Sequence, residues 1–391
     1  MNLIIKKINK EKIINLIGFL YLFFLMRRGG DTKYIFSIIL MISSLFFIYK
    51  NKGQKIIENK WLYISGIIYF VLLTRSFLTN EIIPDRINAY LGMGLYSVIF
   101  LLLCINIDIK ENYNNYIFPL ISFFSLGSLY RGLEDIYLHS SQLSVYRISG
   151  RTYTTIYAGE IGIYFFIGVI SIFIYKKWYL KLAYTFYTGI TLVLIYFTKS
   201  RNAMLMIPLT IGILLIIKYG KKGLIYFSLI LSLVFGLVEY SSHINGLERL
   251  SKISSIKKIK EDNRYTIFKE GLRQGIEKPL TGVGFKEYNR DNLRKTKVEK
   301  VSSFHNVYIE TFATQGVLNL ISYMIFIGSI FIKLIKKYIK SGDLKHIIPI
   351  AVLIYMLLYG LAEPIFYFGK VYQLLFTIIL IGILKREGIN K

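Results

Sequence analysis

Runs of apolar residues long enough to cross a bilayer recur along this sequence, and they constrain its fold more than any other feature. About 20 such residues in a helix span the roughly 30 Å hydrocarbon layer of a membrane. Of the 391 residues, 54% are hydrophobic and only 18% are charged, whereas about a quarter of the residues in a soluble domain carry charge. We therefore expect an all-α polytopic membrane protein and exclude a soluble domain.

Apolar windows between charged residues predict about twelve transmembrane helices. They lie near residues 13–26, 34–49, 61–78, 88–107, 116–130, 156–175, 179–198, 202–217, 222–238, 306–332, 346–362 and 365–384. Lysines precede the first window, as in a signal peptide, but Arg27 and Arg28 follow it where a cleavage site needs small residues. We expect nine helices within 1–238, one large loop at 239–305, and three helices within 306–391.

Basic residues in the short loops predict the orientation, because lysine and arginine resist translocation. With a cytoplasmic amino terminus, 23 basic residues fall inside, 11 in short outer segments and 15 in the loop 239–305. This bias places both termini inside. It places three informative segments outside, namely 131–155, the edge at 199–201, and the loop 239–305.

Arginine is distributed differently from lysine. By the same count, 13 of the 14 arginines lie outside and 22 of the 35 lysines lie inside. A guanidinium group holds two phosphate oxygens in a planar, permanently charged fork, which an ammonium group cannot do. Any single outer arginine is best explained by a solvated basic surface, but the whole distribution predicts an outer face that binds an anion. The net charge of +26 would suggest nucleic acid for a soluble protein; here we expect no nucleic acid partner.

The loop 239–305 is too long to be an idle connection. Its apolar residues recur at helical spacing and predict an amphipathic helix from about 263 to 277, ended by Pro279. The predicted stripe consists of Tyr265, Phe268, Leu272 and Ile276. We expect this helix to lie on the bundle or at the bilayer surface.

Two motifs follow that helix. Gly282 and Gly284 permit a tight turn or a close approach of the backbone to a ligand. A serine at 302 or 303 is placed to cap the next helix, which would set His305 at its outer mouth. On this evidence alone, a histidine there is more often a capping or interface residue than a catalytic one.

Sequence patterns for metal and nucleotide chemistry do not occur. The four histidines form no metal pattern, and HExxH, CxxC, GxxxxGK[ST], GxSxG and DxD are absent from the sequence. The single cysteine, Cys104, cannot form an intrachain disulfide. We expect no metal and no cofactor.

Several outer motifs occur in the order in which one known family carries them. They are Arg147-x-x-Gly150 before a helix, Thr198-Lys-Ser200-Arg201-Asn, Arg264, Pro279-x-x-Gly282-x-Gly284, and His305-Asn306 followed by Gly316. In these motifs the chain resembles the O-antigen polymerase and ligase family. It departs from the family after Gly150, where Arg-Thr-Tyr-Thr-Thr stands in place of Asn-Pro-Asn-like residues.

The resemblance implies a GT-C-like fold and transfer of a glycan from an undecaprenyl diphosphate carrier to a sugar hydroxyl, without metal or nucleotide. The reaction would take place on the periplasmic face of a bacterial inner membrane. The implied partners are the lipid-linked donor and acceptor, the bilayer, a chain-length regulator and a flippase.

The resemblance also suggests roles for individual residues. Arg201 and Arg264 would hold the diphosphate leaving group, and His305 would take the proton of the acceptor hydroxyl. Further candidates for contacts to substrate are Arg147, Ser200, Asn306, Tyr308, Gly282, Gly284 and Glu160. Asn306 or Tyr308 would orient the imidazole or the sugar, and Glu160 would contact either the glycan or a neighbouring helix.

Three functions remain open at this stage. A polymerase and a ligase share the donor and differ in the acceptor, and we prefer the polymerase on family grounds. A lipid-linked oligosaccharide transporter is the third possibility. We disfavour it because the sequence has no obvious internal repeat and its polar residues gather in one outer loop.

Overall fold

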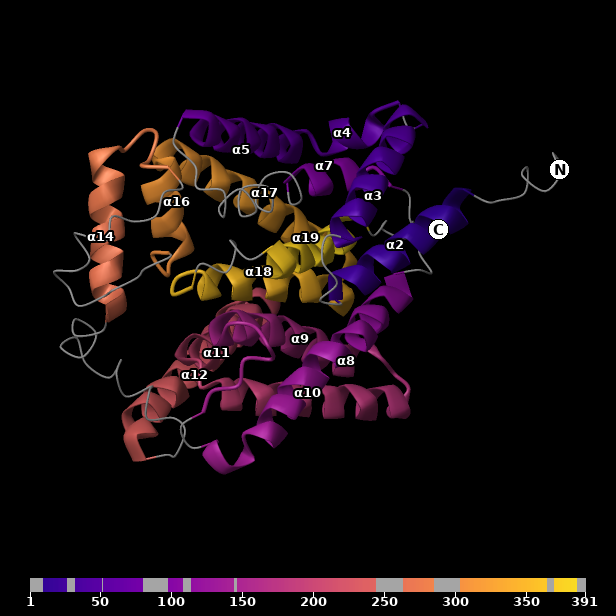
Figure 1. Cartoon of the computed structure of the whole chain (residues 1–391). Coiled ribbons are helices and arrows are strands. Elements are labelled where there is room, and N and C mark those ends of the chain that lie inside the picture. Colours follow the sequence, from indigo (N-terminus) through magenta and orange to yellow (C-terminus); the bar gives the residue numbers. More distant parts are fainter. Residues whose placement is uncertain are drawn as a thin grey trace.

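The computed structural model describes residues 10–26, 32–50, 52–79, 98–107, 114–143, 146–243, 263–284, 303–363 and 369–384. Within these ranges the chain forms helices and turns and no strand. Figure 1 shows the helices packed into one bundle. The helices are α2 (Lys10–Met26), α3 (Thr32–Lys50), α4 (Gln54–Glu58), α5 (Lys60–Thr79), α7 (Phe100–Cys104), α8 (Asn114–Leu138), α9 (Thr154–Ile174), α10 (Trp178–Thr198), α11 (Arg201–Tyr219), α12 (Lys221–Tyr240), α14 (Asn263–Glu277), α16 (Val307–Gln315), α17 (Val317–Ser341), α18 (Ile347–Tyr359) and α19 (Gly369–Leu384).

Six of the described helices are long and apolar enough to cross a membrane, namely α5, α9, α10, α11, α12 and α17. Shorter apolar stretches occupy α2, α3, α18 and the 3-10 turn before it, and α19. A polytopic membrane protein is therefore confirmed, and twelve complete spans are not. Half of the predicted span 88–107 lies outside the described residues, and its described part contains the short helix α7.

Burial separates the helices that form the core from those that face outward. Most side chains of α9 are buried, and nearly all of those in α18 are too. By contrast, α12 exposes Leu229, Leu233 and Phe235. A helix that is apolar all round is buried in protein or surrounded by lipid. We therefore place α9 and α18 at the centre and α12 at the lipid-facing edge.

The predicted span 306–332 is wrong, because it consists of two helices. The chain breaks at Gly316, whose φ of 85° is left-handed, between α16 and α17. A Cβ atom there would lie 2.5 Å from the carbonyl carbon of Leu280, so only glycine lets the two backbones meet. Figure 1 shows α16 lying across the direction of the long helix α5, at one end of the bundle.

The predicted helix 263–277 has the predicted bounds, but the expected stripe is not the face that packs on the protein. Gly271 and Gly275 lie against Phe304 and Phe312, so α14 packs on α16 through its small residues. The side chains of Tyr265, Leu272 and Ile276 are exposed. This exposed apolar stripe fits the second expected location, the bilayer surface.

Hydrogen bonds at the end of the bundle near α16 join segments that are far apart in sequence. The Ser76 hydroxyl at the end of α5 donates to the carbonyl oxygen of Thr314 at 3.4 Å, and the Tyr359 hydroxyl donates to that of Thr155 at 2.6 Å. The helix ends that the distribution of basic residues places on the outer side therefore lie next to one another. Helix α8 differs from its prediction of 116–130, because it continues to Leu138 and takes up part of the expected outer segment.

Lysine stabilises the opposite end of the bundle. The ammonium group of Lys337 donates to the carbonyl oxygens of Gly382 at 3.1 Å and Ile383 at 2.6 Å, close to the end of α19. A cation there satisfies carbonyl groups that the helix leaves unpaired and opposes the negative end of its dipole. At the predicted inner side, this lysine thus also stabilises the end of a helix.

Candidate active site

The first helical turn of α16 fixes the position of His305. The Asn306 side-chain oxygen accepts hydrogen bonds from the backbone N–H groups of Tyr308 at 2.9 Å and Ile309 at 3.0 Å. The helix is therefore capped by this asparagine and not by the predicted serine. Glu310, fully buried, accepts from the backbone N–H of Phe304 at 2.5 Å. These bonds hold the residues on both sides of His305.

His305 itself adopts a left-handed backbone conformation, with φ of 51°. This conformation is uncommon for a residue with a side chain and costs of order 1–3 kcal/mol. It persists where surrounding contacts impose it, and such strain gathers at functional sites.

Three ionisable side chains from distant parts of the chain meet here. The Glu363 carboxylate, at the end of the chain segment that follows α18, forms an ion pair with Arg264 in the first turn of α14. Its second oxygen lies 3.6 Å from His305 Nδ1. The Glu363 side chain is only 4% exposed. A buried carboxylate needs such partners, because leaving it unpaired is expensive.

The imidazole of His305 has one buried and one open edge. Nδ1 is buried and forms no hydrogen bond within the described residues, whereas the side chain as a whole is 37% exposed. That exposure therefore comes from side-chain atoms other than Nδ1. The 3.6 Å contact is longer than a hydrogen bond, and contacts of this kind commonly tighten when substrate binds.

Helix α11 brings Arg201 to the same end of the bundle. Ser200 caps the helix by accepting from the backbone N–H of Ala203 at 3.4 Å. The Ser200 hydroxyl also shares a 3.4 Å hydrogen bond with the hydroxyl of Tyr359, and Asn202 donates to the Tyr359 carbonyl oxygen at 2.8 Å. Both neighbours of Arg201 are thus fixed to the end of α18, four residues before Glu363.

The segment that carries Arg147 runs beside the end of α10. Its Nε donates to the carbonyl oxygen of Thr198 at 3.0 Å. Asp135 holds the following turn by accepting from the backbone N–H groups of Ser149 at 2.7 Å and Gly150 at 3.3 Å. Gly150 has a φ of 52°, and a Cβ there would lie 2.4 Å from the ring of Tyr157. The turn therefore requires glycine, and it anchors Arg147 close to Ser200 and Arg201.

The same carboxylate organises the surroundings of that turn. Asp135 accepts from the Tyr146 hydroxyl at 3.0 Å, and the His139 ring stacks on the Tyr146 ring with centroids 3.7 Å apart. Burial, followed by the bond to Asp135, raises the pKa of Tyr146. Tyr146 stays neutral at physiological pH and works as a hydrogen-bond donor.

Hydrogen bonds connect these two groups of residues. Ser200 and Asn202 bond to Tyr359, which lies four residues before the Glu363 that pairs with Arg264. Three segments, around 147, 201 and 264, thus converge on the end of α18 with one carboxylate and one histidine. Guanidinium groups held next to an open imidazole can stabilise a phosphate leaving group while a hydroxyl loses its proton.

Other predicted residues are used differently. Asn306 donates to the Leu361 carbonyl oxygen at 2.7 Å and Tyr308 to that of Leu357 at 2.8 Å, so both hold backbone rather than the imidazole. Burial raises the pKa of Tyr308 to about 12, which keeps that hydroxyl neutral.

Glycines 282 and 284 approach the protein's own backbone. A Cβ at Gly282, whose φ is 69°, would lie 2.3 Å from the carbonyl carbon of Thr314. The backbone N–H of Gly284 donates to the Thr314 carbonyl oxygen at 3.0 Å. The tight turn expected from sequence is present, and the close approach is to the end of α16.

Glu160 lies inside the bundle, 2% exposed. One of its oxygens accepts from the Ser128 hydroxyl at 2.6 Å and from the Tyr164 hydroxyl at 2.7 Å. Ser128 belongs to α8 and Tyr164 to α9, so these bonds belong to helix packing, the second role expected from sequence.

Sequence reasoning missed Glu363. It assigns this residue no role, because nothing in one sequence tells which basic residues an acid will meet. The usable signal was its place at the outer end of a predicted span, where an acidic residue among apolar neighbours needs a partner. Among the described residues, no three His, Cys, Asp or Glu side chains cluster as a metal site.

These features define a polytopic membrane protein with a cationic, histidine-bearing site at one end of its helical bundle. Comparison with known proteins gives a family match over residues 186–324, to the family described as O-antigen ligase. The match includes Arg201, Arg264 and His305, and it confirms the resemblance to the O-antigen polymerase and ligase family. No curated protein matches the chain.

Proposed function

We propose that the chain is a surface-polysaccharide polymerase that transfers a glycan from undecaprenyl diphosphate to a sugar hydroxyl of a lipid-linked repeat unit. The observation that carries this proposal is the convergence of His305, Glu363 and Arg264 beside Arg201 and Arg147, within and next to the matched segment. The site would face the extracytoplasmic side of a bacterial inner membrane, as the distribution of lysine and arginine predicts.

The proposed reaction is a substitution at the anomeric carbon of the donor sugar. The acceptor oxygen forms a bond to that carbon, the bond from carbon to the phosphate oxygen breaks, and the electron pair leaves with the diphosphate. The acceptor proton passes to Nε2 of His305. Glu363 acts as a positioning residue, because its oxygen faces Nδ1 at 3.6 Å and favours the tautomer that leaves Nε2 free to accept a proton.

Charge on the leaving group is stabilised by guanidinium groups. Arg201 is our first choice, because both of its neighbours are fixed to the end of α18. Arg264 is already paired with Glu363, so its charge serves both the carboxylate and the diphosphate. Arg147 is the third member of this group. Preorganised donors of this kind lower the barrier because they need no rearrangement as charge develops.

The test is transfer by the purified chain in nanodiscs, supplied with a polyprenyl-diphosphate-linked repeat unit and excess EDTA. We expect a ladder of glycans and one released polyprenyl diphosphate for each new linkage. Absence of both products, with the donor and acceptor intact, would contradict the proposal.

A ligase that attaches glycan to lipid A core is the second candidate, because the matched family is described as O-antigen ligase. The surface polysaccharide that cells make after deletion of the gene distinguishes a polymerase from a ligase. Single repeat units on the core indicate lost polymerisation, and bare core indicates lost ligation. In the polymerase case we expect a chain-length regulator and a flippase to work on the same lipid-linked intermediates.

A transporter of lipid-linked oligosaccharide is the remote alternative. It would need a charged substrate site near the middle of the bundle. The buried Glu160 is instead bonded to two neighbouring hydroxyl groups, and the arginines of the candidate site lie at one end of the bundle. This arrangement favours an enzyme.

A further inference from the structure

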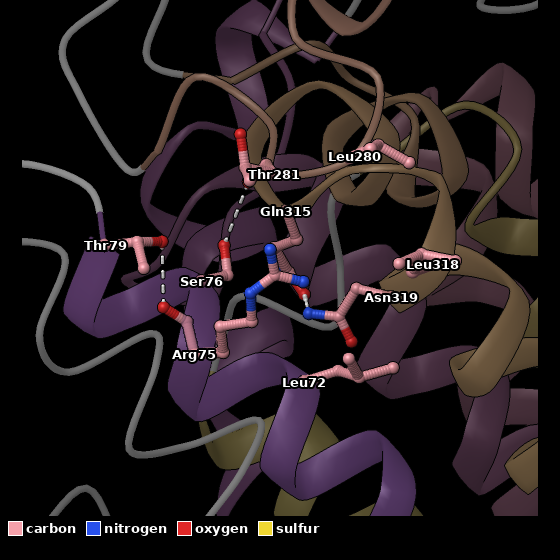
Figure 2. A pocket seen from close by; sticks show the side chains of 9 residues that line it. All are labelled: Leu72, Arg75, Ser76, Thr79, Leu280, Thr281, Gln315, Leu318 and Asn319. Carbon is pink, nitrogen blue, oxygen red and sulfur yellow. Dashed lines mark hydrogen bonds between the residues drawn. The ribbon is translucent and has the colours of Figure 1, made fainter.

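A second polar site lies at the other end of α16. Figure 2 shows a pocket between α5, the turn around Thr281 and the junction of α16 with α17. The Arg75 side chain reaches into this pocket from the last turns of α5. The lining residues are Leu72, Arg75, Ser76, Thr79, Leu280, Thr281, Gln315, Leu318 and Asn319.

Arg75 differs from the other arginines that the structure describes. Arg151, Arg264 and Arg273 form ion pairs with glutamates. Arg147 and Arg131 donate to carbonyl oxygens, and Arg201 also has an interaction partner. The Arg75 guanidinium forms no ion pair or hydrogen bond with any described residue.

The pocket is a shallow hollow of about 10 Å³, so it can take one oxygen of an anion beside Arg75. No acidic residue lines it. Gln315 and Asn319 are 2% and 1% exposed, and Asn319 donates to the Gln315 side-chain oxygen at 2.7 Å, so their amides are held in fixed orientation. The end of α16 and the start of α17 meet here, and their opposite dipole ends offset one another. Arg75 therefore supplies the charge of the site.

The pocket is separate from the His305 site but connected to it by one rigid element. Gln315 ends α16, and Asn306 caps its beginning beside His305. Nine residues at 1.5 Å per residue place the two sites roughly 14 Å apart. The acceptor hydroxyl must reach His305. The diphosphate of the acceptor lies further away, because sugars separate it from that hydroxyl. The two phosphate-binding points of a reaction between two lipid-linked glycans must therefore be offset along the membrane surface.

We propose that the Arg75 pocket binds the diphosphate of the lipid-linked acceptor, while the arginines near His305 bind that of the donor. This proposal rests on the proposed function. It commits to a diphosphate that carries a lipid and a sugar, in contrast to a free phosphate or an ordinary phospholipid headgroup. Arg75 stands at the predicted outer end of α5, where such a diphosphate meets the headgroup layer.

The first test measures KM for donor and acceptor separately with purified protein. Replacing Arg75→Gln should raise KM for the acceptor roughly tenfold or more, because one charge-assisted contact is lost. KM for the donor and kcat at saturating acceptor should change less than twofold. The matched control is Arg273→Gln on α14, which removes an exposed arginine that is already paired with Glu270 and Glu277. An unchanged acceptor KM, or a raised donor KM, overturns the proposal.

A binding measurement tests the site independently of the reaction. Failure of the Arg75 proposal can then be distinguished from failure of the proposed function. Native mass spectrometry with farnesyl diphosphate should show two molecules on the wild-type chain and one on the Arg75→Gln variant. Equal numbers on both would overturn the proposal. Competitors identify the source of the phosphate: displacement of the second molecule by phosphatidylglycerol or by inorganic pyrophosphate at equal concentration would also overturn it.

Discussion

At the scale of single residues, Glu363 connects the two groups that the proposed chemistry needs. Its two oxygens face Arg264 and His305, and its side chain is almost wholly buried. Removing the charge takes away the carboxylate that faces Nδ1 of the imidazole and the acid with which Arg264 forms an ion pair.

We predict that Glu363→Gln lowers kcat by roughly 10²-fold or more while the protein still inserts, in line with the usual contribution of a positioned general base. Steady-state kinetics of the purified variant measure this effect. Glu363→Asp should recover part of the rate, because it restores the charge. Glu277→Gln, an exposed acid paired with Arg273, is the matched control. A Gln variant as active as this control would remove Glu363 from the mechanism.

Arg201 offers a second prediction at this scale. Arg201→Gln should lower kcat by about 10²–10³-fold, the usual effect of removing one donor to a developing charge. The kcat of Arg201→Lys should fall between those of Arg201→Gln and the wild type, because the ammonium group keeps the charge but lacks the planar fork. Equal activity of the Lys and Gln variants with the wild type would exclude a role for Arg201 in leaving-group stabilisation.

The sequence supplied some of these residues and not others, for physical reasons. Motif order pointed to Arg201, Arg264 and His305, and the structure brings their segments together. Pairing partners depend on tertiary contacts between segments about 60 to 100 residues apart, so Glu363 and its bonds could not be predicted. Asn306 is expected from the resemblance to orient the imidazole or the sugar, and in the structure its side-chain oxygen caps α16.

At the scale of elements, small residues control how the outer segments dock. The turn around Gly282 packs on the junction of α16 and α17, and it lines the Arg75 pocket through Thr281. Gly282 and Gly53 both have left-handed backbones, with φ of 69° and 67°, but only Gly282 is in contact with other backbone.

Gly282→Ala should therefore destabilise the protein by about 1–3 kcal/mol more than Gly53→Ala. Both changes share the strain of an alanine at positive φ, and only the first adds a clash with the carbonyl of Thr314. Thermal unfolding in detergent measures the difference. Equal shifts in Tm for the two variants would show that the turn is not held against α16.

The contact between α14 and α16 gives a further prediction. A Cβ at Gly275 would lie 2.4 Å from the ring of Phe312, whereas nothing lies within 4 Å of one at Gly236. Gly275→Val should displace α14, and with it Arg264, so that protease sensitivity of α14 rises and transfer activity falls at least tenfold. Gly236→Val should behave as wild type. An active, protease-resistant Gly275→Val variant would contradict the docking.

Helix bounds were predictable where local signals are strong. The helix Asn263–Glu277 ends before Pro279, as proline requires. The break at Gly316 was not predictable from hydropathy, because its cause is a turn 35 residues earlier in the chain. The apolar stripe of α14 was recognised, but its location was left open between the bundle and the bilayer surface, since periodicity shows that a face is apolar and not what covers it.

At the scale of the whole molecule, the account requires that the end of the bundle with α14 and α16 faces away from the cytoplasm. In a Cys104→Ser background, a membrane-impermeant maleimide should label Lys269→Cys in intact spheroplasts, because this side chain is exposed on α14. Lys340→Cys, exposed at the other end of α17, should react only after permeabilisation. The reversed pattern would place the site in the cytosol.

The central claim is that His305 takes the proton of the acceptor hydroxyl in glycan transfer. It is tested most directly by comparing His305→Ala with His243→Ala, which changes an exposed histidine after α12, in the purified transfer assay with saturating donor and acceptor. We predict that His305→Ala lowers kcat by about 10²–10⁴-fold with both substrates still bound, and that His243→Ala keeps the wild-type rate. Wild-type kcat in the His305→Ala protein would contradict the account.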